Sequence, residues 1–130
     1  MIVDSSVLVA ILKDEPEADR IGEVLTAADG LAMSTASYLE ASIVIDRLAN
    51  PRLSQRLDDL ISDLAIKLVP FSESQAELAR AAYREFGKHS GHPARLNFGD
   101  CFAYALARER GEPLLFKGDD FARTDVVAAS

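Results

Sequence analysis

Four acidic residues occupy comparable places in this 130-residue sequence, each near the end of a short apolar run or the start of a helix. They are Asp4, Glu40, Asp100 and Asp119. Open α/β sheets bind their ligands beyond the carboxyl ends of the strands, so acids at such positions can meet although they are far apart in sequence. Converging carboxylates repel one another until a cation or a proton relieves the repulsion. The pattern therefore predicts an acidic pocket, in which a metal ion would be more useful than a proton for relieving the repulsion.

Each acid also has a simpler interpretation when it is taken singly. Asp4 or Ser5 could be only the N-cap of the helix that follows, and Glu40 could be a solvated helix residue. Asp100 could complement a helix dipole, and the Gly118-Asp119-Asp120 segment could be a turn. The neighbours of two of these acids favour a functional site over the simpler interpretations: Glu40 follows a leucine, and Asp100 lies among aromatic residues. Apolar surroundings disfavour an unpaired charge, so both acids are expected to have a partner.

Short apolar runs alternate with amphipathic segments, which predicts a parallel sheet covered by helices on both faces. The expected strands lie at 1–3, 31–33, 65–71 and 114–116, with 125–127 as a candidate edge strand. The expected helices lie behind Ser5-Ser6 and at about 18–28, 36–49, 53–64, 73–86 and 101–110. The predicted fold class is a three-layer α/β/α sandwich with a short central parallel sheet, built by one domain over residues 1–130. The sequence leaves strand order and register undetermined.

Three local predictions concern how the helices pack, begin and end. The spacing of apolar residues in the helix at 36–49 predicts a buried face made of Leu39, Ile43, Val44 and Leu48. Pro51 is expected to stop this helix. Ser72 is expected to cap the helix at 73–86, with Gln75 at the acidic or amide position of a capping box.

Charge and cysteine content narrow the function. The sequence has 14 basic and 21 acidic residues and a net charge of −7. This balance disfavours nucleic-acid binding through a general positive surface, but it does not exclude a nucleic-acid enzyme. Cys101 is the only cysteine, so no internal disulfide is expected, and we interpret it as a small core residue rather than a nucleophile. The sequence predicts no signal peptide or membrane span, which makes the cytoplasm the expected location.

Four segments, taken in order and with their spacing, resemble a known family. They are Met1-Ile2-Val3-Asp4-Ser5-Ser6, Ser34-Thr35 with Glu40, Asn97-Phe98-Gly99-Asp100-Cys101-Phe102, and Leu114-Leu115-Phe116-Lys117-Gly118-Asp119-Asp120-Phe121. They are similar to the PIN domain, specifically to the VapC toxins of bacterial toxin–antitoxin pairs. The resemblance covers essentially the whole chain.

This resemblance implies a PIN-like endoribonuclease that depends on Mg²⁺, or on Mn²⁺ as the alternative, and cleaves RNA with a metal-activated water. The family's metal-binding and catalytic acids correspond to Asp4, Glu40, Asp100 and Asp119, with Asp120 as the reserve for the fourth acid and Ser6 as a supporting hydroxyl. The family also implies a VapB-like antitoxin that covers the acidic groove. Toxin homodimers would join it in a heterotetramer or a larger complex. The number of metal ions and the RNA target stay open.

Basic residues near the acids are candidates for holding RNA phosphates. They are Lys88, Arg95 and Lys117. The first two lie in a loop at 87–97 that contains glycine and proline, and the third stands beside the fourth acid. The alternative is that all three are ordinary solvated residues. His89 and His92 of the same loop give only a weak signal for a transition-metal site.

Other function classes compete with a nuclease. A phospho-acceptor signalling domain also has an acidic pocket and a lysine after a late strand. It needs an acidic pair where Ser5-Ser6 stands and an aspartate where Pro70-Phe71 stands. A haloacid-dehalogenase-like phosphatase needs Asp-x-Asp at the opening, but residue 6 is a serine. A catalytically silent PIN-like binding module is disfavoured because all the expected acids are present.

Overall fold

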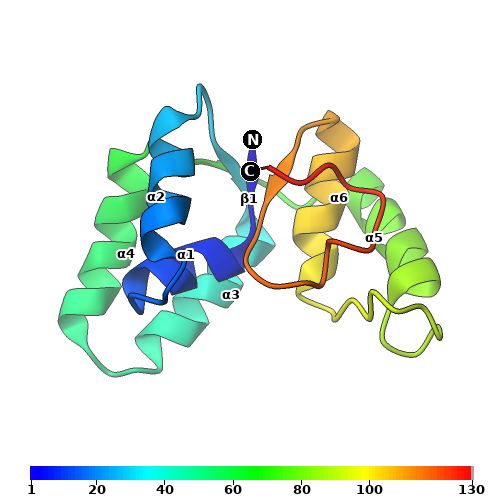
Figure 1. Ribbon diagram of the computed structural model, residues 1–130, viewed down its shortest axis with the longest axis horizontal. Helices are drawn as coiled ribbons and strands as arrows, with labels where there is room; N and C mark the ends of the chain where they lie inside the picture. The colour runs from blue at the N-terminus through cyan, green and yellow to red at the C-terminus, as the bar shows by residue number, and fades with distance from the viewer. Residues whose placement is uncertain (130) are drawn as a thin grey trace.

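The centre of the molecule is a parallel sheet between two groups of helices (Figure 1). The computed structural model describes residues 1–129. Within them the sheet has four strands in the order β3-β2-β1-β4, and every neighbouring pair is parallel. The strands are β1 (Ile2–Val3), β2 (Ala32–Ser34), β3 (Lys67–Val69) and β4 (Leu114–Leu115). The predicted parallel sheet is confirmed.

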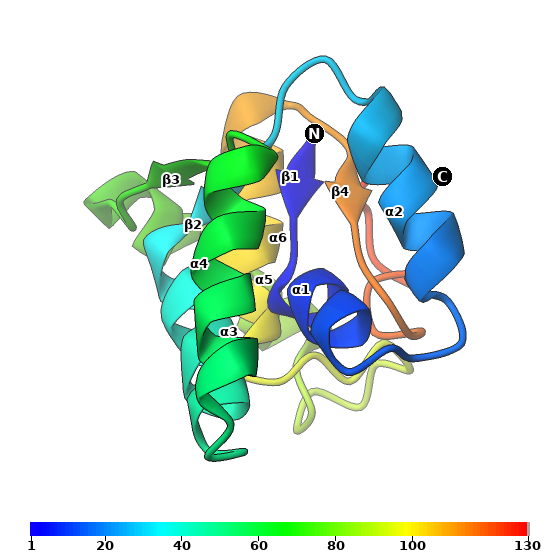
Figure 2. The ribbon, with the colours of Figure 1, turned by 90° about the vertical axis from the view of Figure 1, so that its left-hand side faces the viewer.

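Helices cover both faces of the sheet (Figures 1 and 2). One face carries α1 (Ser5–Leu12), α2 (Ala18–Ala27), α3 (Thr35–Asp46) and α4 (Pro51–Asp63), and the other carries α5 (Glu73–Phe86) and α6 (Asp100–Arg110). Because side chains alternate along a strand, Val3 packs into the core of the first group and Ile2 into the core of the second. This arrangement confirms the three-layer α/β/α sandwich. No helix within residues 1–129 has the length and apolar character needed to cross a membrane.

The parallel register brings the carboxyl ends of the strands to one edge of the sheet. Ile2 stands opposite Ala32 on one side and opposite Leu114 on the other. Directly after β1, the backbone N–H of Asp4 donates to Leu115 O at 3.0 Å, which fixes the end of β1 against β4. Residues that follow β1, β2 and β4 therefore share this edge.

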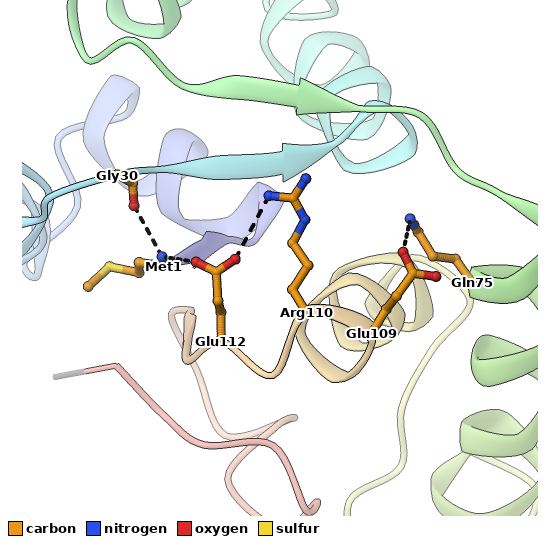
Figure 3. A network of polar contacts seen from close by, with 6 residues as sticks. All are labelled: Met1, Gly30, Gln75, Glu109, Arg110 and Glu112. Carbon is orange, nitrogen blue, oxygen red and sulfur yellow. Dashed lines mark hydrogen bonds and ion pairs between the residues drawn. The ribbon is translucent and has the colours of Figure 1, made fainter.

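Polar contacts at the opposite edge hold the beginning of β1 (Figure 3). The α-amino group of Met1 donates to Glu112 Oε1 at 2.7 Å and to Gly30 O at 3.1 Å. Arg110 Nη1 lies 3.8 Å from the second carboxylate oxygen of Glu112. A charge-assisted contact thus fixes the start of the strand whose end carries Asp4.

The start of α5 is capped as predicted. Ser72 Oγ accepts the backbone N–H of Gln75 at 3.2 Å. The capping box is not completed, because Gln75 Nε2 donates to Pro70 O at 3.4 Å and to Glu109 Oε1 at 3.1 Å. Gln75 therefore ties the start of α5 to the end of α6 (Figure 3).

The boundary between α3 and α4 differs from the prediction. α3 ends at Asp46, and Pro51 is the first residue of α4 rather than the stop of the preceding helix. Asn50 Oδ1 caps α4 by accepting the backbone N–H of Arg52 at 3.0 Å. Proline suits the first helical position because its missing N–H would have no partner within the helix there.

The buried face of α3 was predicted wrongly. The four apolar residues expected in the core are exposed instead, at 58 % for Leu39, 48 % for Ile43, 38 % for Val44 and 45 % for Leu48. The buried residues of the helix are Ser37, Ala41 and Ile45. Both sets have helical spacing, so periodicity alone does not distinguish them. The small side chains at 37 and 41 allow a close approach to neighbouring elements.

The C-terminal segment runs beside β4 without forming a regular strand. Ala128 makes an isolated parallel bridge with Leu114. Leu114 N–H donates to Val127 O at 2.8 Å, and Ala129 N–H donates to Leu114 O at 2.9 Å. The edge strand predicted at 125–127 is thus reduced to a single bridge at residue 128.

Two isoleucines of α3 test its orientation. Ile45→Ala is expected to lower the free energy of unfolding by about 2–5 kcal/mol, because Ile45 is fully buried. Ile43→Ala is expected to change it by less than about 1 kcal/mol, because nearly half of Ile43 is exposed. Urea unfolding followed by circular dichroism measures both. A larger loss for Ile43→Ala would mean that the helix is turned the other way.

Candidate active site

Asp4 is a buried acid at the carboxyl edge of the sheet, with 3 % of the residue exposed. Its Oδ2 accepts the backbone N–H of Ser6 at 3.1 Å and so caps α1. Its Oδ1 is buried and has no hydrogen-bond partner among residues 1–129. Burial raises the pKa of Asp4 to about 6, with hydrogen bonds from Ser6 opposing the rise and the charge of Glu40 adding to it. Asp4 thus keeps one buried carboxylate oxygen that takes part in none of the hydrogen bonds that hold this edge of the sheet.

Glu40 reaches the same edge from α3. Its Oε1 accepts a hydrogen bond from Ser5 Oγ at 2.5 Å, which is in the range of short, charge-assisted bonds. Its Oε2 lies against Gly99, where a Cβ would overlap the carboxylate. Since Gly99 precedes Asp100, these contacts place Glu40 between the start of α1 and the start of α6.

Asp100 opens α6 and exchanges two hydrogen bonds with Asn97. Asn97 N–H donates to Asp100 Oδ2 at 3.0 Å, and Asp100 N–H donates to Asn97 Oδ1 at 2.9 Å. Burial raises the pKa of Asp100 to about 7, opposed by the Asn97 hydrogen bond and reinforced by the carboxylates of Asp120 and Asp4. The structure thus brings Asp4, Glu40 and Asp100 together from three separate elements.

The turn after β4 carries two adjacent acids, and Asp120 is the one that interacts with Asp100. The charge of Asp120 and its side-chain hydrogen bond both help to raise the pKa of Asp100. Asp119 is exposed, and its backbone oxygen accepts the N–H of Ala122 at 3.2 Å. Asp120, the reserve for the fourth acid, is therefore the one of the two whose charge acts on Asp100, and Asp119, the preferred residue, is not.

Ser6 and Lys117 connect α1 to the segment after β4. Ser6 Oγ accepts the backbone N–H of Lys117 at 3.0 Å. The Lys117 ammonium is paired with the carboxylate of Glu15 and lies 3.5 Å from Glu17 Oε2. Both residues were expected near the chemistry, as a supporting hydroxyl and an RNA contact. The structure gives both of them partners within the protein.

The other basic candidates lie in the loop between α5 and α6. Lys88 and Arg95 are exposed there. His92 is part of the loop's own structure, because its ring packs edge-on against Phe86 with 4.9 Å between ring centroids. His92 Nδ1 accepts the N–H of Ala94 at 3.0 Å. These contacts account for His92 without a transition metal.

Cys101 is buried and lacks the features of a nucleophile. Its Sγ donates to Asn97 O at 3.4 Å. Burial, with the neighbouring charge of Asp100, raises the pKa of the thiol to about 11. The thiolate is the nucleophilic form of cysteine, and this pKa keeps it scarce at neutral pH.

An exposed apolar surface borders the carboxylates. It combines the outer face of α3 with Phe98, which is 76 % exposed. A groove of about 320 Å³ lies between Leu39, Ile43, Val44 and Phe98, with Glu40 in its wall. Exposed apolar patches of this kind mark interaction surfaces.

Several residues that shape the site were missed by the sequence analysis. They are Ser5, Asn97, Gly99, Glu15 and Glu17. Asn97 had a usable signal, because a cap residue three positions before an acid is the spacing of a capping box. The others meet their partners through the tertiary fold, and nothing in their local sequence points to those partners.

The donor set suits a hard divalent cation. Mg²⁺ and Mn²⁺ prefer carboxylate oxygens, and Asp4 Oδ1 offers one that is buried and unpartnered. The raised pKa values of Asp4 and Asp100 reflect charge that burial leaves without compensation. Among residues 1–129, no three His, Cys, Asp or Glu side chains already form a finished ligand group. Binding an ion would therefore require these carboxylates to turn toward it.

Comparison with known proteins places this site in a family. The PIN domain family model matches residues 1–127, and the chain belongs to the PIN domain family. Ribonuclease VapC28 of Mycobacterium tuberculosis (strain ATCC 25618 / H37Rv) is 53 % identical over 129 residues, which cover 99 % of this chain and 97 % of that protein. Ribonuclease VapC30 of the same strain is 46 % identical over 130 residues, which cover 100 % and 98 %. The family suggested by the sequence motifs is confirmed.

Solved structures share the fold. The crystal structure of Mycobacterium tuberculosis VapC20, a sarcin–ricin loop cleaving toxin, has a TM-score of 0.75 at 16 % identity and covers 97 % of this chain and 95 % of that one. A toxin–antitoxin complex from Klebsiella pneumoniae has a TM-score of 0.73 at 20 % identity and covers 98 % and 94 %. At these identities the likeness shows the fold alone.

The raised pKa of Asp100 predicts how stability depends on pH in metal-free protein. An unfolded aspartate loses its proton near pH 4, whereas folded Asp100 keeps it to about pH 7. Between these values the folded state binds the extra proton, so this residue's contribution to the free energy of unfolding falls as pH rises. Asp100→Asn should therefore stabilise the metal-free protein at pH 8 by on the order of 1–4 kcal/mol and change it little at pH 4.

Urea unfolding in chelator at several pH values measures this difference. Asp58→Asn, at an exposed position of α4, is the matched control and should follow the wild type across the range. An Asp100→Asn curve parallel to the wild type from pH 4 to 8 would contradict the prediction.

Proposed function

We propose that this chain is a metal-dependent endoribonuclease of the cytoplasm and the toxin of a toxin–antitoxin pair. The observation that carries the proposal is the buried carboxylate cluster around Asp4, whose Oδ1 has no hydrogen-bond partner in the part of the chain that the structure describes. Two relatives that match nearly the whole chain at 53 % and 46 % identity are named ribonucleases, which supports the same activity here. The bond cleaved would be an RNA phosphodiester.

Mg²⁺, with Mn²⁺ as the alternative, is the proposed cofactor, held by Asp4, Glu40 and Asp100. When bound, such an ion lowers the pKa of a coordinated water and offsets charge on the phosphate. The protein's own part is to bury Asp4, to orient Glu40 through the Ser5 hydroxyl and to hold Asp100 through the neighbouring asparagine. These contacts limit the arrangements that the carboxylates can adopt, which lowers the entropic cost of binding.

We propose Asp120, rather than Asp119, as the fourth acid of the site. The support is its electrostatic interaction with Asp100. A carboxylate there would add negative charge to the part of the pocket nearest the start of α6 and so strengthen its preference for a cation.

Lys88 and Arg95 remain the candidates for contacts to RNA phosphates. Both are exposed in the loop that leads to Asp100, and phosphate contacts position a nucleic acid without specifying its sequence. A chain with a net charge of −7 needs such local positive charge to bring RNA to an acidic pocket.

The proposed protein partner is a VapB-like antitoxin, bound to homodimers of this chain in a heterotetramer or a larger complex. Solved structures with this fold include a toxin–antitoxin complex. The apolar groove beside Glu40 offers a surface that a protein partner would remove from water. A partner seated there would stand next to the carboxylates.

Removing single carboxylates tests the enzyme proposal. Asp4→Asn keeps a good cap for α1, and Asp100→Asn keeps the shape of its side chain. Each is expected to lower metal-dependent RNA cleavage by more than about a hundredfold, because even partners outside the ligand shell of a metal site contribute 10–100-fold. Cleavage of a labelled RNA with Mg²⁺ or Mn²⁺, and with chelator, measures this.

Circular dichroism checks that both variants fold, and Asp58→Asn should cleave like the wild type. Cleavage that survives chelator, or that both variants retain, would contradict the metal mechanism. Absence of any cleavage by the wild type would favour a silent binding module.

The two adjacent acids can be separated by paired variants. Asp120→Asn is expected to lower cleavage by roughly 10–100-fold, whereas Asp119→Asn should lower it by less than about threefold. The difference follows from the interaction of Asp120 with Asp100. Rates measured over a Mg²⁺ titration compare the variants, and a larger loss for Asp119→Asn would restore that residue as the fourth acid.

A further inference from the structure

The turn that carries Asp120 lies outside the sheet and the helices, so its position depends on side-chain anchors. It spans residues 116–121, and Gly118 adopts a φ of +100°. Its far end is anchored by Phe121, which is 2 % exposed and belongs to the hydrophobic core beneath α5 and α6. Within the turn, its ring packs against Phe116 with 5.1 Å between ring centroids. Between the anchors, Asp119 and Asp120 are exposed.

Lys117 anchors the near end of the turn in two ways, through its backbone and through its side chain. Its backbone N–H donates to Ser6 Oγ at 3.0 Å, which joins the turn to the first turn of α1. Its ammonium is paired with Glu15 and lies 3.5 Å from Glu17 Oε2, which joins the turn to the connection between α1 and α2. Lys117 thus attaches the turn both to the first turn of α1, which Asp4 caps, and to the segment that follows α1.

We propose that Lys117 is a positioning residue that clamps the 116–121 turn onto α1 and so holds Asp120 beside Asp100. This inference rests on the proposed function, because it concerns the placement of a proposed site acid. A displacement of about 1 Å in a reacting or ligand-binding group can reduce a rate on the order of a hundredfold. The clamp would therefore affect turnover without touching the substrate.

The competing role for Lys117 is a direct contact to an RNA phosphate. Its ammonium is already paired with one carboxylate and close to a second, and 33 % of its side chain is exposed. A phosphate would have to displace Glu15 and Glu17, and the freed carboxylates would repel it. These partners favour a clamp over a substrate contact.

Steady-state kinetics distinguish the two roles, because a clamp and a phosphate contact predict different effects when Lys117 loses its pairing with Glu15 and Glu17. For a clamp, Lys117→Met and the double variant Glu15→Gln/Glu17→Gln both lower kcat, by roughly 10–100-fold, with KM nearly unchanged, and Lys117→Arg retains most activity. For a phosphate contact, Lys117→Met raises KM, whereas the double variant releases the cation and leaves KM unchanged or lowered. The second pattern would overturn the clamp.

A readout on metal-free protein is independent of activity. Hydrogen–deuterium exchange in chelator is expected to be several-fold faster across residues 117–122 in Lys117→Met and in the double variant, because a released turn opens more often. Lys13→Met and Asp14→Asn, at exposed neighbouring positions, are the matched controls and should exchange like the wild type. Unchanged exchange in this segment in both test variants would overturn the proposal.

The two measurements also separate this inference from the proposed function. If the wild type cleaves no RNA, the ribonuclease proposal fails while the exchange experiment still decides whether Lys117 clamps the turn. If Lys117→Met does not fold, the double variant and Lys117→Arg carry the test, since both retain a positive charge at position 117.

Discussion

Burial of negative charge at the ends of parallel strands is the constraint on which the rest of this structure depends. Asp4 is almost fully buried, one of its oxygens caps α1, and the other has no hydrogen-bond partner within the described residues. A buried carboxylate in that state is unfavourable, and its raised pKa expresses the cost. The fold tolerates this cost because strand contacts and backbone hydrogen bonds fix Asp4 in place. A bound cation would offset this cost, which links the burial of Asp4 to the proposed chemistry.

The other carboxylates are held by short polar contacts that come from different parts of the chain. The Ser5 hydroxyl orients Glu40, and Asn97 orients Asp100. Close packing contributes as well, because a side chain at position 99 would overlap the Glu40 carboxylate. The turn bearing Asp120 belongs to no strand or helix, so contacts from its own residues hold it in place. Lys117 attaches this turn to α1 through its backbone N–H and to Glu15 through its ammonium.

The orientation of α3 links the site to the surface around it. The helix turns Ala41 inward and leaves Glu40 at the flank of the buried face, within reach of α1 and α6. As a consequence, Leu39 and Ile43 face outward beside Phe98. The apolar groove and the carboxylates thus adjoin because one helix contributes to both. A partner that covers the groove would necessarily approach the site.

The sequence by itself determined the fold class and the alternation of strands and helices, because both depend on local periodicity. It also identified three acids that come together in the structure, because parallel strands end at a common edge of the sheet. Tertiary structure decided which face of α3 is buried, since two sets of residues have equally good helical spacing. It also decided that Asp120 interacts with Asp100, because a turn's conformation is set by its anchors rather than by its composition. Lys117 shows the same division: the sequence places a cation beside the acids, and only the packing of Glu15 and Glu17 against it shows that its charge is used within the protein.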